Sequence, residues 1–286
     1  MSPRERQEHI LIVGGAADAR QVGLRAALHG YGVTLYDGDA AALAETQRWY
    51  LSSAPEVAEA TGMPVHAVHT SASSIVLSAD LSEAARGATL VFEFAPDIFA
   101  VKQGLLTVLD GLCPYETIFA TTSLAHGPSA IATSCGRTDR LVAVTFHGPL
   151  GQVGLTEIRP QSETSHATLT RVTDVAHTLE TVVVTLKKER RQSLIEGFDV
   201  APLKTALQHA ADGVASVEDI DRAWIATMPS SIGPFGMIDA LGLDTMLEIT
   251  RQGVDGEAGA LTRYAFLKRY VDEGRLGAKS GEGFYS

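Results

Sequence analysis

The stretch Ile10-Leu11-Ile12-Val13-Gly14-Gly15-Ala16-Ala17-Asp18-Ala19 decides the fold of this 286-residue chain. Residues 10–13 are a short apolar run rich in β-branched side chains, which predicts a buried strand, and the two glycines end it. Apolar residues then recur at helical spacing as far as Leu28. The stretch therefore predicts a strand, a glycine turn and a helix, the unit from which parallel sheets are built.

The same alternation continues through the first two thirds of the chain. Helical stretches separate most of the strand-like runs, which are residues 33–36, 74–77, 90–94, 117–121, 141–146 and 182–186. Such alternation predicts a parallel sheet with helices on both faces and ligands beyond the carboxyl ends of the strands. Beyond residue 186 the periodicity is helical throughout, over residues 203–211, 217–225, 238–249 and 261–271.

These patterns predict an α/β fold, a Rossmann-type doubly wound and mostly parallel sheet followed by an all-α C-terminal domain. We expect the dinucleotide-binding domain to span residues 1–187 and the helical domain to span residues 188–286. No internal repeat is present. The length is sufficient for each part to bury a core of its own.

Composition excludes several classes of protein. Hydrophobic residues make up 45% and charged residues 20% of the chain, and the formal net charge is -11. An acidic chain without a long basic cluster is a poor partner for nucleic acid. The first apolar run is too short for a signal peptide or a membrane span. Cys113 and Cys135 lack metal-ligand spacing, so we expect free thiols, no metal and a cytoplasmic protein.

The glycine turn is an altered dinucleotide fingerprint. Gly14 occupies its first position and Ala19 the tolerated third, but Ala16 replaces the second glycine, where a methyl group opposes close approach of the pyrophosphate. Asp18 adds a carboxylate beside the helix N-terminus. Asp37 ends the second strand at the spacing of an acid that accepts from ribose hydroxyls, which favours NAD over NADP. We expect NAD binding to be retained.

Several longer blocks carry a resemblance to a known family. They are residues 30–37, 79–84, 91–97, 213–223 (GVASVEDIDRA), 233–235, 242–244 and 274–285 (GRLGAKSGEGFY). On these blocks the chain resembles the L-3-hydroxyacyl-CoA dehydrogenase family, which includes 3-hydroxybutyryl-CoA dehydrogenases, over essentially its full length. The resemblance implies an NAD-binding Rossmann domain, a helical domain that forms a homodimer, and catalysis between them. It also implies that Glu93 and Lys102 lie near the nicotinamide half of NAD.

The family's chemistry requires a histidine that accepts the hydroxyl proton and a glutamate that holds the imidazole. Glu157 matches the glutamate. Counting forward from Arg140 and backward from Glu157 places Thr145 at the histidine position, and threonine is no base at neutral pH. His147 follows two residues later, on the same face of a strand and about 6–7 Å nearer its end. We name His147 as a candidate base that Glu157 would support.

The family also places Ser and Asn side chains at the substrate oxygen. The serine position falls on Leu124, with Ser123 beside it, and the sequence contains no Asn, so Glu196 is a candidate replacement. His126 follows the carboxyl end of a predicted strand and borders the expected cleft. The candidate catalytic residues are therefore Glu157, His147, His126 and Ser123.

The segment that helps to hold coenzyme A in the family is poor in positive charge here. Between Gly38 and Leu77 only Arg48 is Lys or Arg, and the first lysine of the chain is Lys102. Since the phosphates of coenzyme A favour cationic neighbours, we expect a carrier-bound acyl group or a small uncharged metabolite instead.

Three hypotheses remain open at this point. The first is an NAD-linked oxidoreductase altered for a non-standard hydroxy or keto substrate. The second is a non-redox enzyme in the same fold that uses its acid and base residues for cyclisation, dehydration or hydrolysis. The third is a non-catalytic binding subunit.

Overall fold

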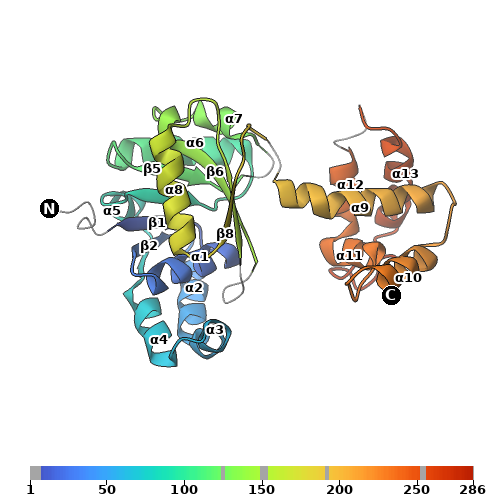
Figure 1. The fold of residues 1–286 in the computed structure, drawn as a ribbon, viewed down its shortest axis with the longest axis horizontal. Helices are drawn as coiled ribbons and strands as arrows, with labels where there is room; N and C mark the ends of the chain where they lie inside the picture. The colour runs from blue at the N-terminus through green and yellow to red at the C-terminus, as the bar shows by residue number, and fades with distance from the viewer. Residues whose placement is uncertain (1–7, 124–125, 149–153, 191–192, 252–255, 286) are drawn as a thin grey trace. The chain divides into compact units, whose positions relative to one another are not determined.

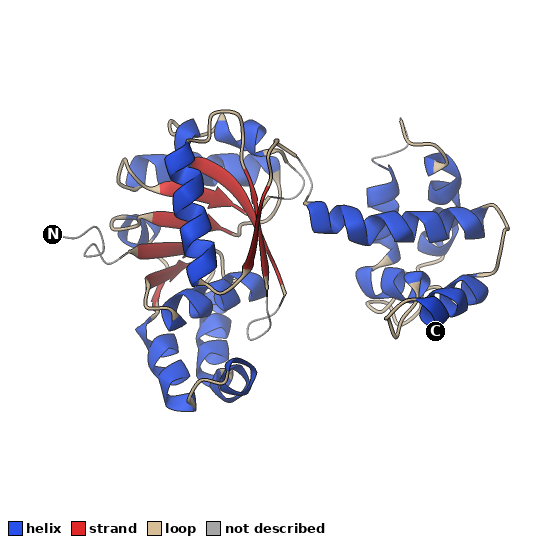
Figure 2. Cartoon of the chain, in the orientation of Figure 1, coloured by secondary structure: helices blue, strands red, loops and turns tan. Residues whose placement is uncertain are grey.

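The computed structural model describes residues 8–123, 126–148, 154–190, 193–251 and 256–285. Two compact units divide the chain, residues 1–193 and 194–286. The strands gather in the first unit, and the second is helical (Figure 2). The predicted fold class, a Rossmann-type α/β sheet followed by a helical domain, is confirmed.

The first unit contains an eight-stranded sheet with the order β3-β2-β1-β4-β5-β6-β7-β8 (Figure 1). All neighbouring strands pair parallel except β6 and β7, which pair antiparallel. The strands are β1 His9–Val13, β2 Gly32–Tyr36, β3 Val76–Ser78, β4 Leu90–Glu93, β5 Ile118–Thr121, β6 Leu141–His147, β7 Leu155–Arg159 and β8 Val182–Thr185.

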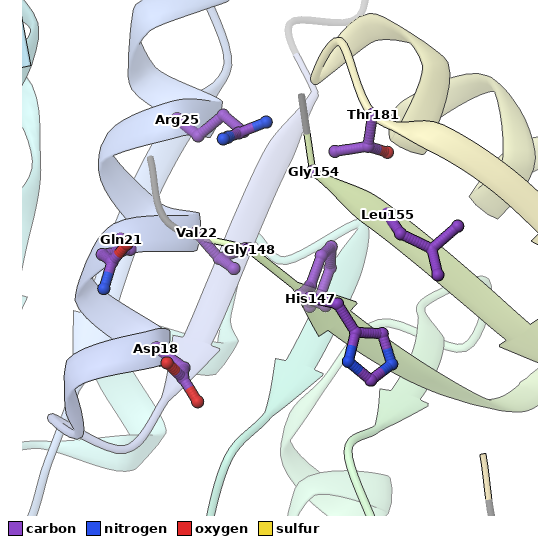
Figure 3. Close-up of a pocket in the computed structure, with 10 residues that line it drawn as sticks. Asp18, Gln21, Val22, Arg25, His147, Gly148, Gly154, Leu155 and Thr181 are labelled. Carbon is purple, nitrogen blue, oxygen red and sulfur yellow. The ribbon is translucent and has the colours of Figure 1, made fainter. Parts of the chain in front are cut away.

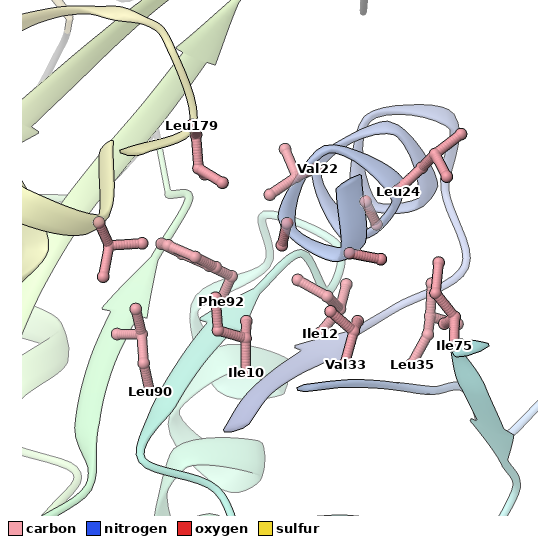
Figure 4. Close-up of a cluster of buried hydrophobic side chains, with 14 of the residues drawn as sticks. Ile10, Ile12, Val22, Leu24, Val33, Leu35, Ile75, Leu90, Phe92 and Leu179 are labelled. Atoms are coloured by element: carbon pink, nitrogen blue, oxygen red, sulfur yellow. The ribbon is translucent and has the colours of Figure 1, made fainter. Parts of the chain in front are cut away.

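Helices cover both faces of this sheet, as expected for buried parallel strands. One apolar cluster joins Ile12 and Phe92 to Val22 and Leu24 of α1 (Figure 4). The same cluster includes Val144 and residues of α3, α4 and α8. The opposite cluster joins Leu11 and Val91 to α5, α6 and α7. The helices of the unit are α1 Ala17–Leu28, α2 Ala40–Ser52, α3 Ala54–Thr61, α4 Val65–Ser74, α5 Leu81–Ala85, α6 Phe99–Leu112, α7 Pro128–Ala132 and α8 His166–Thr178, with a 3-10 turn at Thr138–Arg140.

The second unit packs its helices around Leu207, Ile238, Met246 and Phe284. Residues 238–249, expected as one helix, are interrupted at Gly242, whose φ of +100° ends α11. A left-handed backbone of this kind breaks helical continuity and favours glycine. The helices of this unit are α9 Leu194–Ala211, α10 Val217–Thr227, α11 Pro234–Leu241, α12 Leu243–Arg251 and α13 Ala260–Asp272.

The boundary between the units lies at residue 193, whereas the sequence indicated residue 187. The segment between them is held by the first unit. Glu189 accepts a hydrogen bond from the Ser129 amide at the start of α7 (2.9 Å), and the Arg190 carbonyl accepts one from Arg159 (3.4 Å). Among the described helices, none is both long and apolar enough to cross a membrane.

Candidate functional site

The turn after β1 requires its first glycine. Gly14 has a φ of +111°, and a side chain there would place Cβ 3.2 Å from the Phe94 carbonyl oxygen. Its amide donates to the Tyr36 carbonyl at the end of β2 (2.8 Å). A residue with a side chain would be strained in this backbone conformation and crowded against β4. Gly14 therefore positions the turn at the carboxyl ends of β1, β2 and β4.

The N-terminus of α1 faces solvent. Ala16 is the N-cap residue, and its methyl side chain cannot accept a hydrogen bond from the first amides of the helix. Ala16 and Asp18 are exposed, whereas Ala19 is fully buried in the core beneath the helix. The uncapped amides and the helix dipole favour an anion at this end, and the Asp18 carboxylate opposes one.

Asp37 links the end of β2 to the glycine turn. One carboxylate oxygen accepts from the Gly15 amide (2.7 Å), and the other accepts from the Asp39 amide (2.8 Å). The side chain is half-buried. Since each carboxylate oxygen can accept two hydrogen bonds, Asp37 keeps acceptor positions for the hydroxyls of a bound ribose.

Glu93 and Lys102 form a buried ion pair between β4 and α6. The Lys102 ammonium lies 2.9 and 3.0 Å from the two Glu93 oxygens, and both side chains are almost fully buried. The Ala95 amide and the Thr121 hydroxyl each donate to Glu93 at 2.6 Å. The two residues expected beside the cofactor are therefore bonded to one another, and they fix the ends of β4 and β5.

Ser123 lies just beyond β5 and is fully buried. Its hydroxyl donates to Asp97 (2.6 Å) and accepts from the His126 amide (3.1 Å). The His126 ring packs against Phe99, with ring centroids 5.0 Å apart. Ser123 thus organises the loop that carries His126. The expected serine position, Leu124, lies outside the described residues, and so does the side chain of Glu196.

Thr145 and Glu157 lie opposite one another in the β6–β7 ladder. Both are buried, and so is Arg159, which follows Glu157 by two residues on the same face of β7. The Arg159 Nε lies 3.7 Å from a Glu157 oxygen, and its NH2 group donates to the Thr145 hydroxyl (3.3 Å). The residues brought together at the predicted imidazole position are thus a hydroxyl, a carboxylate and a guanidinium.

His147 pairs with Leu155 in the same ladder and lines a pocket of about 290 Å³. Figure 3 shows Asp18, Gln21 and Arg25 of α1 on one wall of this pocket and His147 and Leu155 on the other. The His147 Nε2 atom is buried and makes no hydrogen bond to any described residue. The pocket extends along α1 from Asp18 to Arg25 and reaches the end of β6, so it lies between this helix and the imidazole of His147.

Two family models account for nearly the whole chain. The NAD binding domain of 3-hydroxyacyl-CoA dehydrogenase matches residues 9–190, and the C-terminal domain of that enzyme matches residues 200–286. The chain belongs to the 3-hydroxyacyl-CoA dehydrogenase family. The resemblance inferred from the sequence blocks is therefore confirmed.

Relatives in this family are similar over most of their length. The mitochondrial hydroxyacyl-coenzyme A dehydrogenase of Homo sapiens is 28% identical over 285 residues, covering 97% of this chain and 90% of that protein. A solved diketoreductase, which acts on dicarbonyl compounds, is 30% identical with a TM-score of 0.84, covering 97% of this chain and 98% of that one. A 3-hydroxybutyryl-CoA dehydrogenase from Ralstonia eutropha has the same fold, with a TM-score of 0.88, 22% identity, and coverage of 97% and 98%.

NAD is the cofactor in this family, and the geometry of this chain fits it. The left-handed Gly14, the uncapped start of α1 and the open acceptor positions of Asp37 suit a pyrophosphate and a ribose. These residues would hold the adenosine half and the phosphates, and the cofactor would supply or accept a hydride. The expectation that NAD is the cofactor is confirmed. Neither the non-redox alternative nor the non-catalytic one gains support from these relatives.

Sequence reasoning missed Arg159, Asp97 and Thr121. Arg159 carried a usable signal, because a charged residue two positions after Glu157 in an apolar strand must share its buried face. Asp97 and Thr121 carried none, since their roles depend on how the loop after β4 and the end of β5 meet Ser123 and Glu93.

Proposed function

We propose that this chain is an NAD-dependent oxidoreductase that reduces a carbonyl group on a substrate other than a free 3-oxoacyl-CoA, with small dicarbonyl compounds or carrier-bound 3-oxoacyl groups as its substrate class. The observation that carries the proposal is the pairing of Glu157 with Arg159 and Thr145 at the position where the family has an imidazole. The residue that replaces the imidazole, Thr145, cannot accept the proton of a substrate alcohol at neutral pH.

Two further observations support this substrate class. The diketoreductase named above is among the more similar solved structures and acts on dicarbonyl compounds. The segment from residue 38 to residue 77, which would meet coenzyme A, contains one Lys or Arg in a chain of net charge -11. A highly charged anion would find few cationic partners there.

Reduction also needs a proton for the carbonyl oxygen, and we assign it to His147. Its side chain belongs to the lining of the pocket beside α1, and its buried Nε2 atom makes no hydrogen bond to a described residue. His126, held by Ser123 beside Phe99, is the alternative donor. The variants His147→Gln and His126→Gln distinguish the two candidates. Loss of the true proton donor should lower kcat by about 10²-fold or more, and replacement of the other histidine should change kcat little.

The test of the proposal is NADH oxidation with a matched panel of carbonyl compounds. Pentane-2,4-dione, ethyl acetoacetate, a carrier-bound acetoacetyl group and acetoacetyl-CoA would be compared at equal concentration. We expect kcat/KM to be at least about tenfold higher for one of the first three than for acetoacetyl-CoA, a difference of about 1.4 kcal/mol. A clear preference for acetoacetyl-CoA would refute the proposal.

The proposal includes a cytoplasmic location and a homodimeric state. Cys113 and Cys135 are free and buried, and burial raises the pKa of the Cys113 thiol to about 11. Unreactive buried thiols suit a reducing cytoplasm. Resemblance to the family supports a homodimer formed through the helical unit, which analytical ultracentrifugation tests directly.

A further inference from the structure

Arg159 joins three segments at the carboxyl-end region of the sheet. Its NH2 group donates to the Ser123 carbonyl at 2.5 Å and to the Thr145 hydroxyl at 3.3 Å, and its NH1 group donates to the Arg190 carbonyl at 3.4 Å. The side chain is fully buried. Because guanidinium is planar and always charged, these contacts fix a permanent positive charge against the hydroxyl of Thr145.

The contact with Arg159 decides how the Thr145 hydroxyl can be used. A threonine hydroxyl has one hydrogen to donate and two lone pairs to accept with, and the guanidinium, which can only donate, occupies one lone pair. The described residues provide no acceptor for its hydrogen. Thr145 is buried, with 7% of the residue exposed, and it lies two residues before the end of β6.

The positive charge of Arg159 favours the Thr145 hydroxyl as a hydrogen-bond donor over a proton acceptor. A cation next to the oxygen opposes the arrival of another proton and strengthens the hydroxyl as a hydrogen-bond donor. A carbonyl oxygen can only accept, whereas an alcohol that is to be oxidised needs an acceptor for its proton. Thr145 and Arg159 therefore suit a carbonyl oxygen, which accepts a hydrogen bond, and they supply no acceptor for the proton of the corresponding alcohol.

We infer that the Thr145 hydroxyl, fixed as a donor by Arg159, donates a hydrogen bond to the carbonyl oxygen of the substrate and stabilises the negative charge that develops there. This inference rests on the proposed carbonyl reduction and deepens it. Thr145 contacts the substrate, and Arg159 is a positioning residue that acts through Thr145. The site then binds the carbonyl compound more tightly than the alcohol and stabilises the transition state that joins them.

The first test replaces the hydroxyl without changing its volume. We expect Thr145→Val to lower kcat/KM for the reduction of the best dicarbonyl by about 10²-fold, the usual cost of losing one donor to a developing oxyanion. Thr145→Ser keeps the donor and should stay within about tenfold of the wild type. The NADH dissociation constant and the circular dichroism spectrum should match the wild type in both variants.

The second test addresses the role of Arg159. Arg159→Met alone would leave Glu157 as an uncompensated buried charge, so the informative variant is Arg159→Met together with Glu157→Gln, which removes both charges. We expect this double variant to bind NADH and to lose most of the effect of the hydroxyl, so that adding Thr145→Val lowers kcat/KM by less than about tenfold further. A purely structural role for Arg159 would leave the effect of Thr145→Val at its full size in that background.

A binding measurement separates the two proposals. The carbonyl compound is titrated into enzyme saturated with NAD⁺, and the alcohol into enzyme saturated with NADH. We expect wild-type enzyme to bind the carbonyl more tightly and Thr145→Val to lose that preference. If wild-type enzyme reduces dicarbonyls and Thr145→Val reduces them equally well, the inference falls and the proposed function stands. If wild-type enzyme neither reduces nor binds any carbonyl of the panel, both fall.

Discussion

At the scale of single residues, Asp18 should act against the cofactor that the rest of its turn favours. Its exposed carboxylate lies in the first turn of α1, where the uncapped amides favour a phosphate. We expect Asp18→Asn to tighten NADH binding by about two- to fivefold at low salt, which corresponds to about 0.3–1 kcal/mol of charge interaction at a helix end. Fluorescence titration of NADH measures the change.

The matched control for this prediction is Glu56→Gln, which removes an exposed carboxylate from the first turn of α3. It should leave NADH binding unchanged. The gain from Asp18→Asn should also shrink at 0.5 M salt, because exposed charges are screened. An affinity that is equal in the wild type and in Asp18→Asn at low salt would show that the carboxylate lies too far from the phosphates to matter.

Residue-level prediction from the sequence depends on position along a strand. The sequence count placed Thr145 at the family's histidine position, and the structure adds that Thr145 lies opposite Glu157 in the β6–β7 ladder. The count did not reveal that Ser123 bonds to Asp97, or that Arg159 reaches both Ser123 and Thr145. Those contacts join segments far apart in the chain, and no local pattern contains them.

At the scale of elements, the Lys102–Glu93 pair should hold α6 to the ends of β4 and β5. We expect Lys102→Met to lower the free energy of unfolding by about 3–5 kcal/mol, because it leaves a fully buried carboxylate without its cation. The double variant Lys102→Met with Glu93→Gln should recover much of that loss. Urea unfolding followed by circular dichroism measures both, and equal stability of Lys102→Met and the wild type would contradict the prediction.

The elements themselves were predictable to different degrees. Strands such as β1 and β4 contain continuous apolar runs, residues 10–13 and 90–92, because helices cover both faces of the sheet, and such runs are visible in the sequence. The direction of β7 was not visible, because parallel and antiparallel neighbours share the same apolar pattern. The break between α11 and α12 was missed for another reason, since Gly242 in a helical pattern is compatible with a continuous helix until its φ of +100° is known.

At the scale of the whole molecule, the two units contain different titratable groups whose pKa values are shifted, and the causes of the shifts differ. Burial lowers the pKa of His9 on β1, and the same cause, opposed by Glu180 and reinforced by Arg25, lowers the pKa of His29 after α1. Both histidines belong to the first unit. In the second unit, the hydrogen bond from Lys279 lowers the pKa of Asp244, and that from Lys204 lowers the pKa of Glu257.

The sign of the pH dependence follows from these directions. The pKa of each histidine is lower in the folded chain than its ordinary value of about 6.5, so the unfolded chain binds the proton more readily. Protonation therefore favours unfolding, and the folded chain loses stability as the pH falls below about 6.5. A carboxyl group with a lowered pKa loses its contribution only near pH 4 and below. We therefore expect the first unit to lose stability as the pH falls from 7.5 to 5.5, and the stability of the second unit to stay constant over this range.

Hydrogen exchange at pH 7.5 and 5.5, corrected for the intrinsic exchange rate, measures this difference in each unit of the intact protein. Protection should fall in β1 and β2 and stay constant in α9 to α13. The variant His9→Gln, in which an amide can replace the hydrogen bond between the His9 ring and the Thr34 hydroxyl (2.9 Å), should reduce the pH effect. His66→Gln is the control, because this exposed imidazole on α4 meets water in both the folded and the unfolded chain. A pH effect of the same size in the wild type and in His9→Gln would assign the loss to other groups.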